Sequence, residues 1–165
     1  GLVLSEGNGL STLLQLESVL VVNVKSPMPG PWTLKASSTG LHTLRVTGLS
    51  LLDFTHGFSR KPTRNITATS LRPILGIPTY VVLNATGLIP PGVINKLELI
   101  NLQGLSLIEV PVFPHPQQLY SSVYNVSGIL PPEGFFYLRV SGVDVDNFIF
   151  QRITPSALNA EIPGR

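Results

Sequence analysis

Apolar and polar residues alternate with a period of two along residues 31–36 and again along residues 41–48. The alternation places Trp32 and Leu34 on the apolar face of the first stretch and Leu44 on that of the second, with serine, threonine and glycine in between. A period of two interrupted by turn residues is typical of an antiparallel hairpin with one buried face. Because Trp32 is the only tryptophan, and tryptophan buries a large apolar area, we expect this hairpin to anchor a core.

The pattern upstream of this hairpin changes twice. Three leucines in residues 10–14 are spaced i, i+3, i+4, which predicts one short helical turn. Residues 18–24 are apolar on both faces, which predicts a central or covered strand. The region therefore has fewer strands than the roughly seven of a sandwich. We expect residues 1–70 to be a partial β-sandwich, the C-terminal part of a domain whose opening strands lie upstream of Gly1.

The second part of the chain begins after a polar stretch without a clear period, residues 61–72, which predicts a linker. Beyond it, short stretches with the pattern of strands are separated by Gly, Pro and Asn turns. They are residues 78–84, 95–102, 106–112, 120–126, 135–141 and 147–153. A first strand near residues 72–75 would complete a sandwich of about seven strands. The sequence thus predicts an all-β chain, with an immunoglobulin/fibronectin-like β-sandwich over residues 71–165.

The alternation also predicts which side chains of this sandwich face its core. They are Val81, Leu83, Phe136, Leu138 and Val140. Arg139 is expected to point outward. In the last stretch the pattern leaves open whether Phe148 and Phe150 or Ile149 and Ile153 face inward.

The composition excludes several classes of protein. Charged residues make up 12% of the chain, about half of the usual share. The densest basic cluster, Arg60, Lys61 and Arg64, is too thin for a nucleic-acid-binding stripe. No cysteine is present, which excludes disulfides and zinc–thiolate sites. No apolar run is long enough to cross a bilayer, so we expect no membrane span in this segment. The thin basic cluster likewise leads us to expect no nucleic-acid partner.

Three N-glycosylation sequons begin at Asn65, Asn84 and Asn125, and none has proline at its middle position. Each lies in or beside a predicted turn or at a strand end, where an attached glycan would point into solvent. We expect at least one of the three to be glycosylated. Glycans would also help to explain how so apolar a chain stays soluble.

Asp144, Asp146 and Asn147 place three oxygen-bearing side chains in one short loop. Calcium prefers such ligands, but the twelve-residue spacing of a helix–loop–helix calcium site is absent. Asp and Asn are also ordinary hairpin-turn residues, so we expect a turn and no cofactor, with calcium as the alternative metal. With Tyr120 and Tyr124, the loop supports an alternative function for the chain, a calcium- or carbohydrate-binding β-sandwich module.

The sequence contains no motif of a nucleotide-binding, metalloprotease or hydrolase active site. Its three histidines, His42, His56 and His115, lie far apart in the sequence. We therefore expect no catalytic residues and a protein that is not an enzyme.

Several runs of residues resemble hemicentins and related secreted von Willebrand factor A domain-containing proteins. The most specific is residues 52–63, Leu-Asp-Phe-Thr-His-Gly-Phe-Ser-Arg-Lys-Pro-Thr. The resemblance continues through residues 31–48, 76–84 and 148–152 and covers nearly the whole chain.

The resemblance implies a secreted, extracellular matrix or cell-junction glycoprotein in which this segment follows an A domain and serves as a spacer or adhesion module. It implies other matrix or cell-surface proteins, and neighbouring domains of the same chain, as partners. The metal-binding D-x-S-x-S motif of the family's A domain is not in this sequence. The resemblance therefore implies no metal site here.

Overall fold

The structure is a computed structural model that describes residues 9–28, 32–35, 39–113 and 123–164. The chain divides into two compact units, Gly1–Gly48 (unit 1) and Leu49–Arg165 (unit 2). Strands dominate the described residues, and the only helix among them is the short 3₁₀ helix η1 (Ile66–Ala68). None of the described helices is long and apolar enough to span a lipid bilayer.

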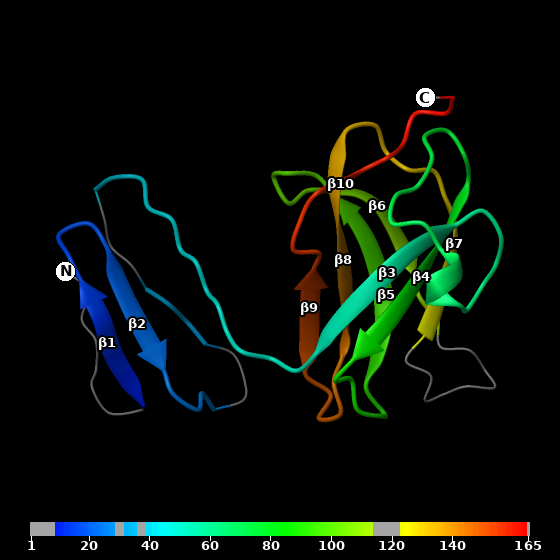
Figure 1. Cartoon of the computed structure of the whole chain (residues 1–165). Coiled ribbons are helices and arrows are strands. Elements are labelled where there is room, and N and C mark those ends of the chain that lie inside the picture. Colours follow the sequence, from blue (N-terminus) through cyan, green and yellow to red (C-terminus); the bar gives the residue numbers. More distant parts are fainter. Residues whose placement is uncertain (1–8, 29–31, 36–38, 114–122, 165) are drawn as a thin grey trace. The chain divides into compact units, whose positions relative to one another are not determined.

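Unit 1 contains an antiparallel pair of strands, β1 (Leu10–Gln15) and β2 (Leu20–Val24), shown in Figure 1. The strand predicted over residues 18–24 is confirmed from Leu20 onward, but the prediction that it is central or covered is wrong, because its described partner is β1 alone and Val21 is 39% exposed. The helical turn predicted over residues 10–14 is also wrong. Those residues pair with β2 across a tight turn in which the Leu16 N–H donates to the Val19 carbonyl, 2.8 Å away. The ladder satisfies more backbone groups than one isolated helical turn can.

The hairpin predicted over residues 31–48 is also wrong for the residues that the structure describes. Residues 32–35 and 39–48 carry no strand. Trp32 is 53% exposed, and its indole N–H donates to the Met28 carbonyl, 2.9 Å away. Alternation produces a strand only where a neighbouring strand pairs with it and a second layer covers its apolar face. Unit 1 gives the described part of this stretch neither.

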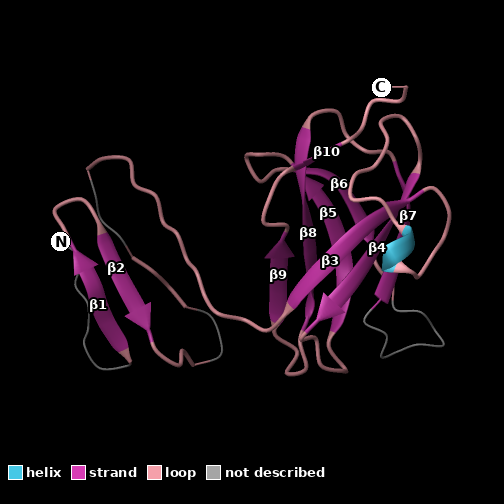
Figure 2. Cartoon of the chain, viewed as in Figure 1, coloured by secondary structure: helices cyan, strands magenta, loops and turns pink. Residues whose placement is uncertain are grey.

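Unit 2 is a sandwich of two antiparallel sheets (Figures 1 and 2). The three-stranded sheet has the order β3 (Asp53–Ser59), β4 (Thr79–Thr86), β7 (Val123–Ile129). The other sheet has the order β10 (Leu158–Asn159), β8 (Phe135–Val143), β5 (Val93–Ile100), β6 (Ser106–Pro111), and β9 (Ile149–Ile153) also pairs with β8.

Strands β9 and β10 form one interrupted edge strand along β8. β9 pairs with the second half of β8 and β10 with its first two residues. Thr154 bridges the break, because its N–H donates to the Leu138 carbonyl and its hydroxyl accepts from the Leu138 N–H. With this edge counted once, three strands face four, and the predicted all-β sandwich is confirmed.

The first strand of the sandwich lies earlier in the chain than predicted. Residues 72–75 form only an isolated bridge, between Ile74 and Glu161, and the opening strand is instead β3. Phe54 and Phe58 of β3 are buried in the core that β4 and β8 also line. Unit 2 therefore begins at Leu49 rather than at residue 71, because the sandwich core needs these two phenylalanines.

The predicted core is confirmed. Each of the six predicted strand stretches overlaps an observed strand. The side chains predicted to face inward are all fully buried: Val81, Leu83, Phe136, Leu138 and Val140. In the last strand Phe150 packs against the core, whereas Ile149 and Ile153 are exposed on the outside.

One titratable side chain, His56, lies on the core face of β3. His56 is opposite Leu83 in the ladder and between the rings of Phe54 and Phe58, whose centroids are 6.5 and 5.6 Å away. Its Nε2 is buried and has no hydrogen-bond partner among the residues that the structure describes. Burial lowers the pKa of His56 from its ordinary value, because the apolar surroundings disfavour the imidazolium.

Unit 2 is expected to lose stability in mild acid through His56. Its pKa is lower in the folded than in the unfolded chain, so the unfolded chain binds more protons once the pH falls below about 6.5. Urea midpoints of unit 2 measured from pH 7.5 to pH 5 should therefore decrease, and His56→Leu should flatten this decrease. The exposed His42, replaced by leucine, is the control. An unchanged pH dependence in His56→Leu would contradict the assignment.

Candidate functional site

The ion-paired side chains of unit 2 lie on the outer face of a sheet rather than between the sheets, where His56 is the titratable residue described above. The inner faces are filled by one apolar cluster. Among the residues that the structure describes, no three His, Cys, Asp or Glu side chains come together as a metal site.

The outer face of the β3–β4–β7 sheet carries two of the sequon positions. Asn84 is half-buried on β4 and pairs with Thr55 of β3 and Val123 of β7. Position 125 on β7 pairs with Val82, the next outward-facing residue of β4. The ladder therefore places positions 84 and 125 on the same face of neighbouring strands.

The third sequon asparagine, Asn65, lies at the start of η1. Its Oδ1 accepts hydrogen bonds from the N–H and the hydroxyl of Thr67, at 3.0 and 2.7 Å, and its side chain is exposed. η1 lies against β3 and β4, as Figure 2 shows. The side chain of Thr69 lies where a Cβ on Gly57, an outward-facing position of β3, would be. The three sequons thus gather on one side of unit 2, here called the sequon face.

The loop between β8 and β9 is a hydrogen-bonded turn. Asp144 Oδ1 accepts from the backbone N–H groups of Asp146 and Phe148, at 3.0 and 2.8 Å. Asn147 adopts a positive φ of 65°, which asparagine tolerates in tight turns. Two backbone N–H groups therefore already donate hydrogen bonds to Oδ1 of Asp144.

Tyr124, predicted as a possible partner of this loop in carbohydrate binding, faces the core. It is buried on β7, and its hydroxyl accepts from the Ile94 N–H at 3.4 Å. The prediction that it lines an exposed binding surface is wrong, because its strand position alternates with the outward-facing residues. Tyr120 lies outside the described residues.

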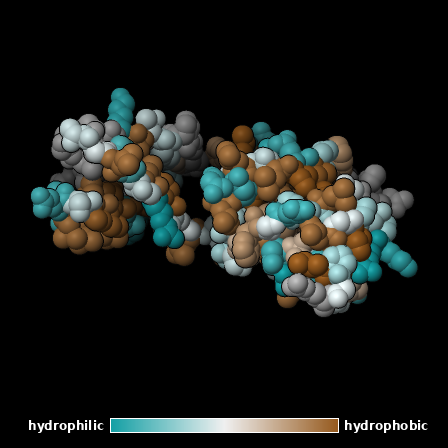
Figure 3. All heavy atoms as spheres, turned by 90° about the horizontal axis from the view of Figure 1, so that it is seen from above, coloured by the Kyte–Doolittle hydropathy of each residue, from teal (hydrophilic) through white to brown (hydrophobic). Residues whose placement is uncertain are grey.

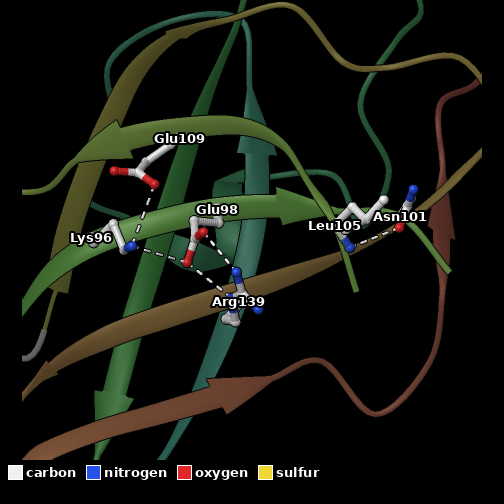
Figure 4. A network of polar contacts seen from close by, with 6 residues as sticks. All are labelled: Lys96, Glu98, Asn101, Leu105, Glu109 and Arg139. Carbon is white, nitrogen blue, oxygen red and sulfur yellow. Dashed lines mark hydrogen bonds and ion pairs between the residues drawn. The ribbon is translucent and has the colours of Figure 1, made fainter. Parts of the chain in front are cut away.

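The outer face of the other sheet carries a cluster of four charged side chains, drawn in Figure 4. Glu98 on β5 lies between Arg139 on β8 and Glu109 on β6 in the ladder. Arg139 donates to both carboxylate oxygens of Glu98, from Nε at 2.9 Å and from a terminal nitrogen at 2.7 Å. Lys96 Nζ lies 3.4 Å from Oε2 of both Glu98 and Glu109. Arg139 points outward, as predicted, and its partners form what we call the ion-paired face.

The ion pairs of Glu98 offset two unfavourable features of this arrangement, its like-charged neighbour and its burial. Glu98 and Glu109 are like charges directly opposite each other, which destabilises a sheet, and the Glu98 side chain is only 3% exposed. The two hydrogen bonds from Arg139 lower the pKa of Glu98 more than its burial raises it. The same hydrogen bonds to Glu98 raise the pKa of Arg139, because they stabilise its charged form. Both groups are therefore charged at neutral pH.

A shallow hollow lies at one end of the ion-paired face. It has a volume of about 380 Å³ and is lined by Ile100, Tyr137, Ile153 and residues 101–104 of the β5–β6 turn. Asn101 holds this turn, because its Oδ1 accepts from the N–H of Gln103 at 3.0 Å and from the N–H of Leu105 at 2.9 Å, the second of which Figure 4 draws. The arrangement can bind a protein surface through apolar contact beside a charged centre.

The ion-paired face was not predicted from the sequence. Lys96 and Glu98 alternate with apolar residues in a predicted strand, which is a signal of an outward charged row. Their partners come from strands that are far away in the sequence, and Arg139 lies 41 residues from Glu98. Only the strand register brings them together.

The Glu98→Gln change is expected to lower the free energy of unfolding of unit 2 by about 3 kcal/mol at pH 7, because it leaves the Arg139 charge without its partner. The matched change Glu109→Gln, at a side chain that is 58% exposed, should cost no more than about 1 kcal/mol. Because the folded pKa of Glu98 is lowered, the difference should be complete above about pH 5 and should disappear as the pH falls through that pKa. Urea unfolding measures both values, and equal effects at pH 7 would contradict this account.

Comparison with known proteins places the chain among its relatives. Residues 3–51 match the family model described as hemicentin galactose-binding domain-like. Over 99% of its length, the chain is 43% identical to Hemicentin-1 of Mus musculus and 44% identical to Hemicentin-1 of Homo sapiens. It is 35% identical to Hemicentin-2 of Mus musculus, also over 99% of its length. No solved structure matches it.

The chain spans 3% of the length of each of these relatives. The similarity includes both units, since it leaves only 1% of the chain uncovered. Over nearly its whole length, this chain is therefore a homologue of one segment of the hemicentins.

Proposed function

We propose that the chain is a non-enzymatic structural and adhesion segment of a secreted extracellular-matrix or cell-junction glycoprotein. Its role is to hold neighbouring domains apart and to offer an interaction surface to matrix or cell-surface proteins. The homology to hemicentins supports the extracellular setting. The alternative of calcium or carbohydrate binding at the β8–β9 loop has less support, because backbone groups already occupy Asp144 Oδ1 and Tyr124 is buried.

The observation that carries the spacer role is the path of the chain through unit 2. The chain enters beside β9, where the Leu52 carbonyl accepts from Arg152 Nε at 2.8 Å. It leaves beyond β10, where the Glu161 N–H donates to the Pro73 carbonyl. Figure 1 shows that the start of β3 and the short strand β10 lie at opposite ends of the sandwich. A module whose chain enters at one end and leaves at the other adds its own length to the distance between the domains on either side of it.

The length of this spacer follows from its strands. β8 has nine residues, and at about 3.3 Å per residue it extends for about 30 Å. Both ends are fixed to the sandwich by backbone hydrogen bonds rather than by side chains alone. Unit 2 should therefore behave as a rigid rod of this length.

A distance measurement across unit 2 tests the spacer role. Because the chain has no cysteine, the substitutions Leu51→Cys and Ile162→Cys provide the two sites for spin labels. Both positions are exposed, and they lie near the two ends of unit 2. Pulsed electron resonance should give a narrow distribution centred near about 30 Å. Labels at Leu51→Cys and Ile89→Cys, both near the entry end, serve as the short-distance control. A broad distribution for the first pair would rule out a rigid spacer.

The sequon face supports the glycoprotein part of the proposal. The exposed Asn65 uses its Oδ1 for the hydrogen bonds to Thr67, and no hydrogen bond from its amide nitrogen is found among the described residues. That nitrogen is the atom to which an N-linked glycan attaches. Asn84 and position 125 lie on the same side of the module.

Secretion of the chain from animal cells is expected to yield N-glycans, with Asn65 more fully occupied than Asn84 because Asn65 is exposed and Asn84 is half-buried. Intact mass and peptide mapping should show the loss of one glycan in Asn65→Gln. Thr67→Ser, which keeps the sequon, should retain it. Finding Asn65, Asn84 and Asn125 all unmodified in the secreted protein would refute this part of the proposal.

A further inference from the structure

The ion-paired face carries both exposed charges and exposed apolar side chains. Ile149 and Ile153 are exposed on β9 at one edge, and Leu107 is exposed on β6 at the other. Lys96 lies between these edges on β5, and Glu109 lies on β6, the strand that also carries Leu107. Exposed apolar groups around polar ones are typical of a protein-binding surface.

We propose that the ion-paired face binds a second copy of the same chain. The inference deepens the proposed adhesion function and rests on it, because a segment that pairs with itself would join two molecules of a matrix protein. The arrangement of charge, the apolar surface and the position of the sequons each favour this partner over a different protein.

The ion-paired face carries exposed charges of both signs, which can pair with the charges of a second copy. Glu98 is used by Arg139, so the most exposed charges of the face are Lys96, 34% exposed, and Glu109, 58% exposed, which lie 3.4 Å from each other within one copy. A partner of a single sign would be repelled by one of them. A second copy related by a twofold axis lying between the two side chains presents Glu109 to Lys96 and Lys96 to Glu109.

The apolar part of the face fits the same partner. The hollow lined by Ile100, Tyr137 and Ile153 lies on the face that also exposes Leu107. A surface with both a hollow and an exposed leucine can bury apolar area against its own copy. The sequon face belongs to the other sheet, so glycans there would leave the ion-paired face accessible.

The size of the face sets the expected affinity. Four strands about 4.8 Å apart, each about 25 Å long, give a face of about 500 Å², at the low end for a specific interface. We therefore expect a reversible dimer with a Kd of about 10–100 µM rather than a permanent one.

Sedimentation equilibrium of the whole chain, produced without glycans, tests the proposal from 1 to about 500 µM. The wild type should be in monomer–dimer equilibrium, and Ile153→Lys should weaken it by at least about tenfold. Leu71→Lys, at an exposed apolar residue outside this face, should leave the equilibrium unchanged. Thermal melting confirms that each variant is folded.

A charge exchange identifies the twofold contact. Lys96→Glu gives a face with only negative exposed charges and Glu109→Lys one with only positive charges, so each variant alone should stay monomeric. Mixed one to one, the two should form a heterodimer at least as tight as the wild-type dimer, and added salt should weaken it.

Three outcomes would overturn the proposal. They are a wild-type chain that is monomeric at 500 µM, association that Ile153→Lys leaves intact, and charge variants that do not bind each other. The second would instead assign the association to another surface, such as the exposed apolar residues of unit 1 that Figure 3 shows as brown. None of these outcomes changes the spin-label distance or the glycan occupancy, so the spacer and glycoprotein proposals stand or fall separately.

Discussion

Burial of the two apolar sheet faces against each other is the constraint on which unit 2 depends. The core needs a phenylalanine-rich strand at the edge of the smaller sheet, and β3 provides it with Phe54 and Phe58. The edge strand of the larger sheet stays in register across a break because Thr154 replaces the missing ladder bonds. Once both faces are covered, every second residue must point outward. The two outer faces are consequences of this core.

The alternation of apolar and polar residues predicted the fold correctly where the apolar positions are buried in the structure. Leu138 and Val140 alternate with outward residues, and both are fully buried on β8, where Val140 lies between β5 and β9 and Leu138 between β5 and Thr154, so pattern and environment agree. The same alternation around Trp32 was misleading, because the described part of unit 1 supplies no pairing strand and no covering layer. A period of two describes what a strand would bury, and it does not show whether anything covers it.

The candidate surfaces were predictable only in part. The sequon asparagines follow from the sequence alone, but their position on one side of the module follows from the pairing of Val82 with position 125 and from the packing of η1. The partnership of Glu98 with Arg139 was not predictable, because it depends on the register of β5 against β8. Sequence motifs report chemistry that is local along the chain, whereas a face of a sheet is assembled from distant strands.

The Glu98–Arg139 pair explains why the ion-paired face is not simply apolar. In energetic terms, a well-packed apolar pair at these positions would stabilise the sandwich as well or better. Such a change would, however, leave a flat hydrophobic sheet between Ile153 and Leu107, and surfaces of that kind associate with little selectivity. The bidentate bonds fix Arg139 in one orientation and leave Lys96 and Glu109 as the exposed charges. In a chain with so few charged residues, this placement restricts the partners of the face to those with matching charges.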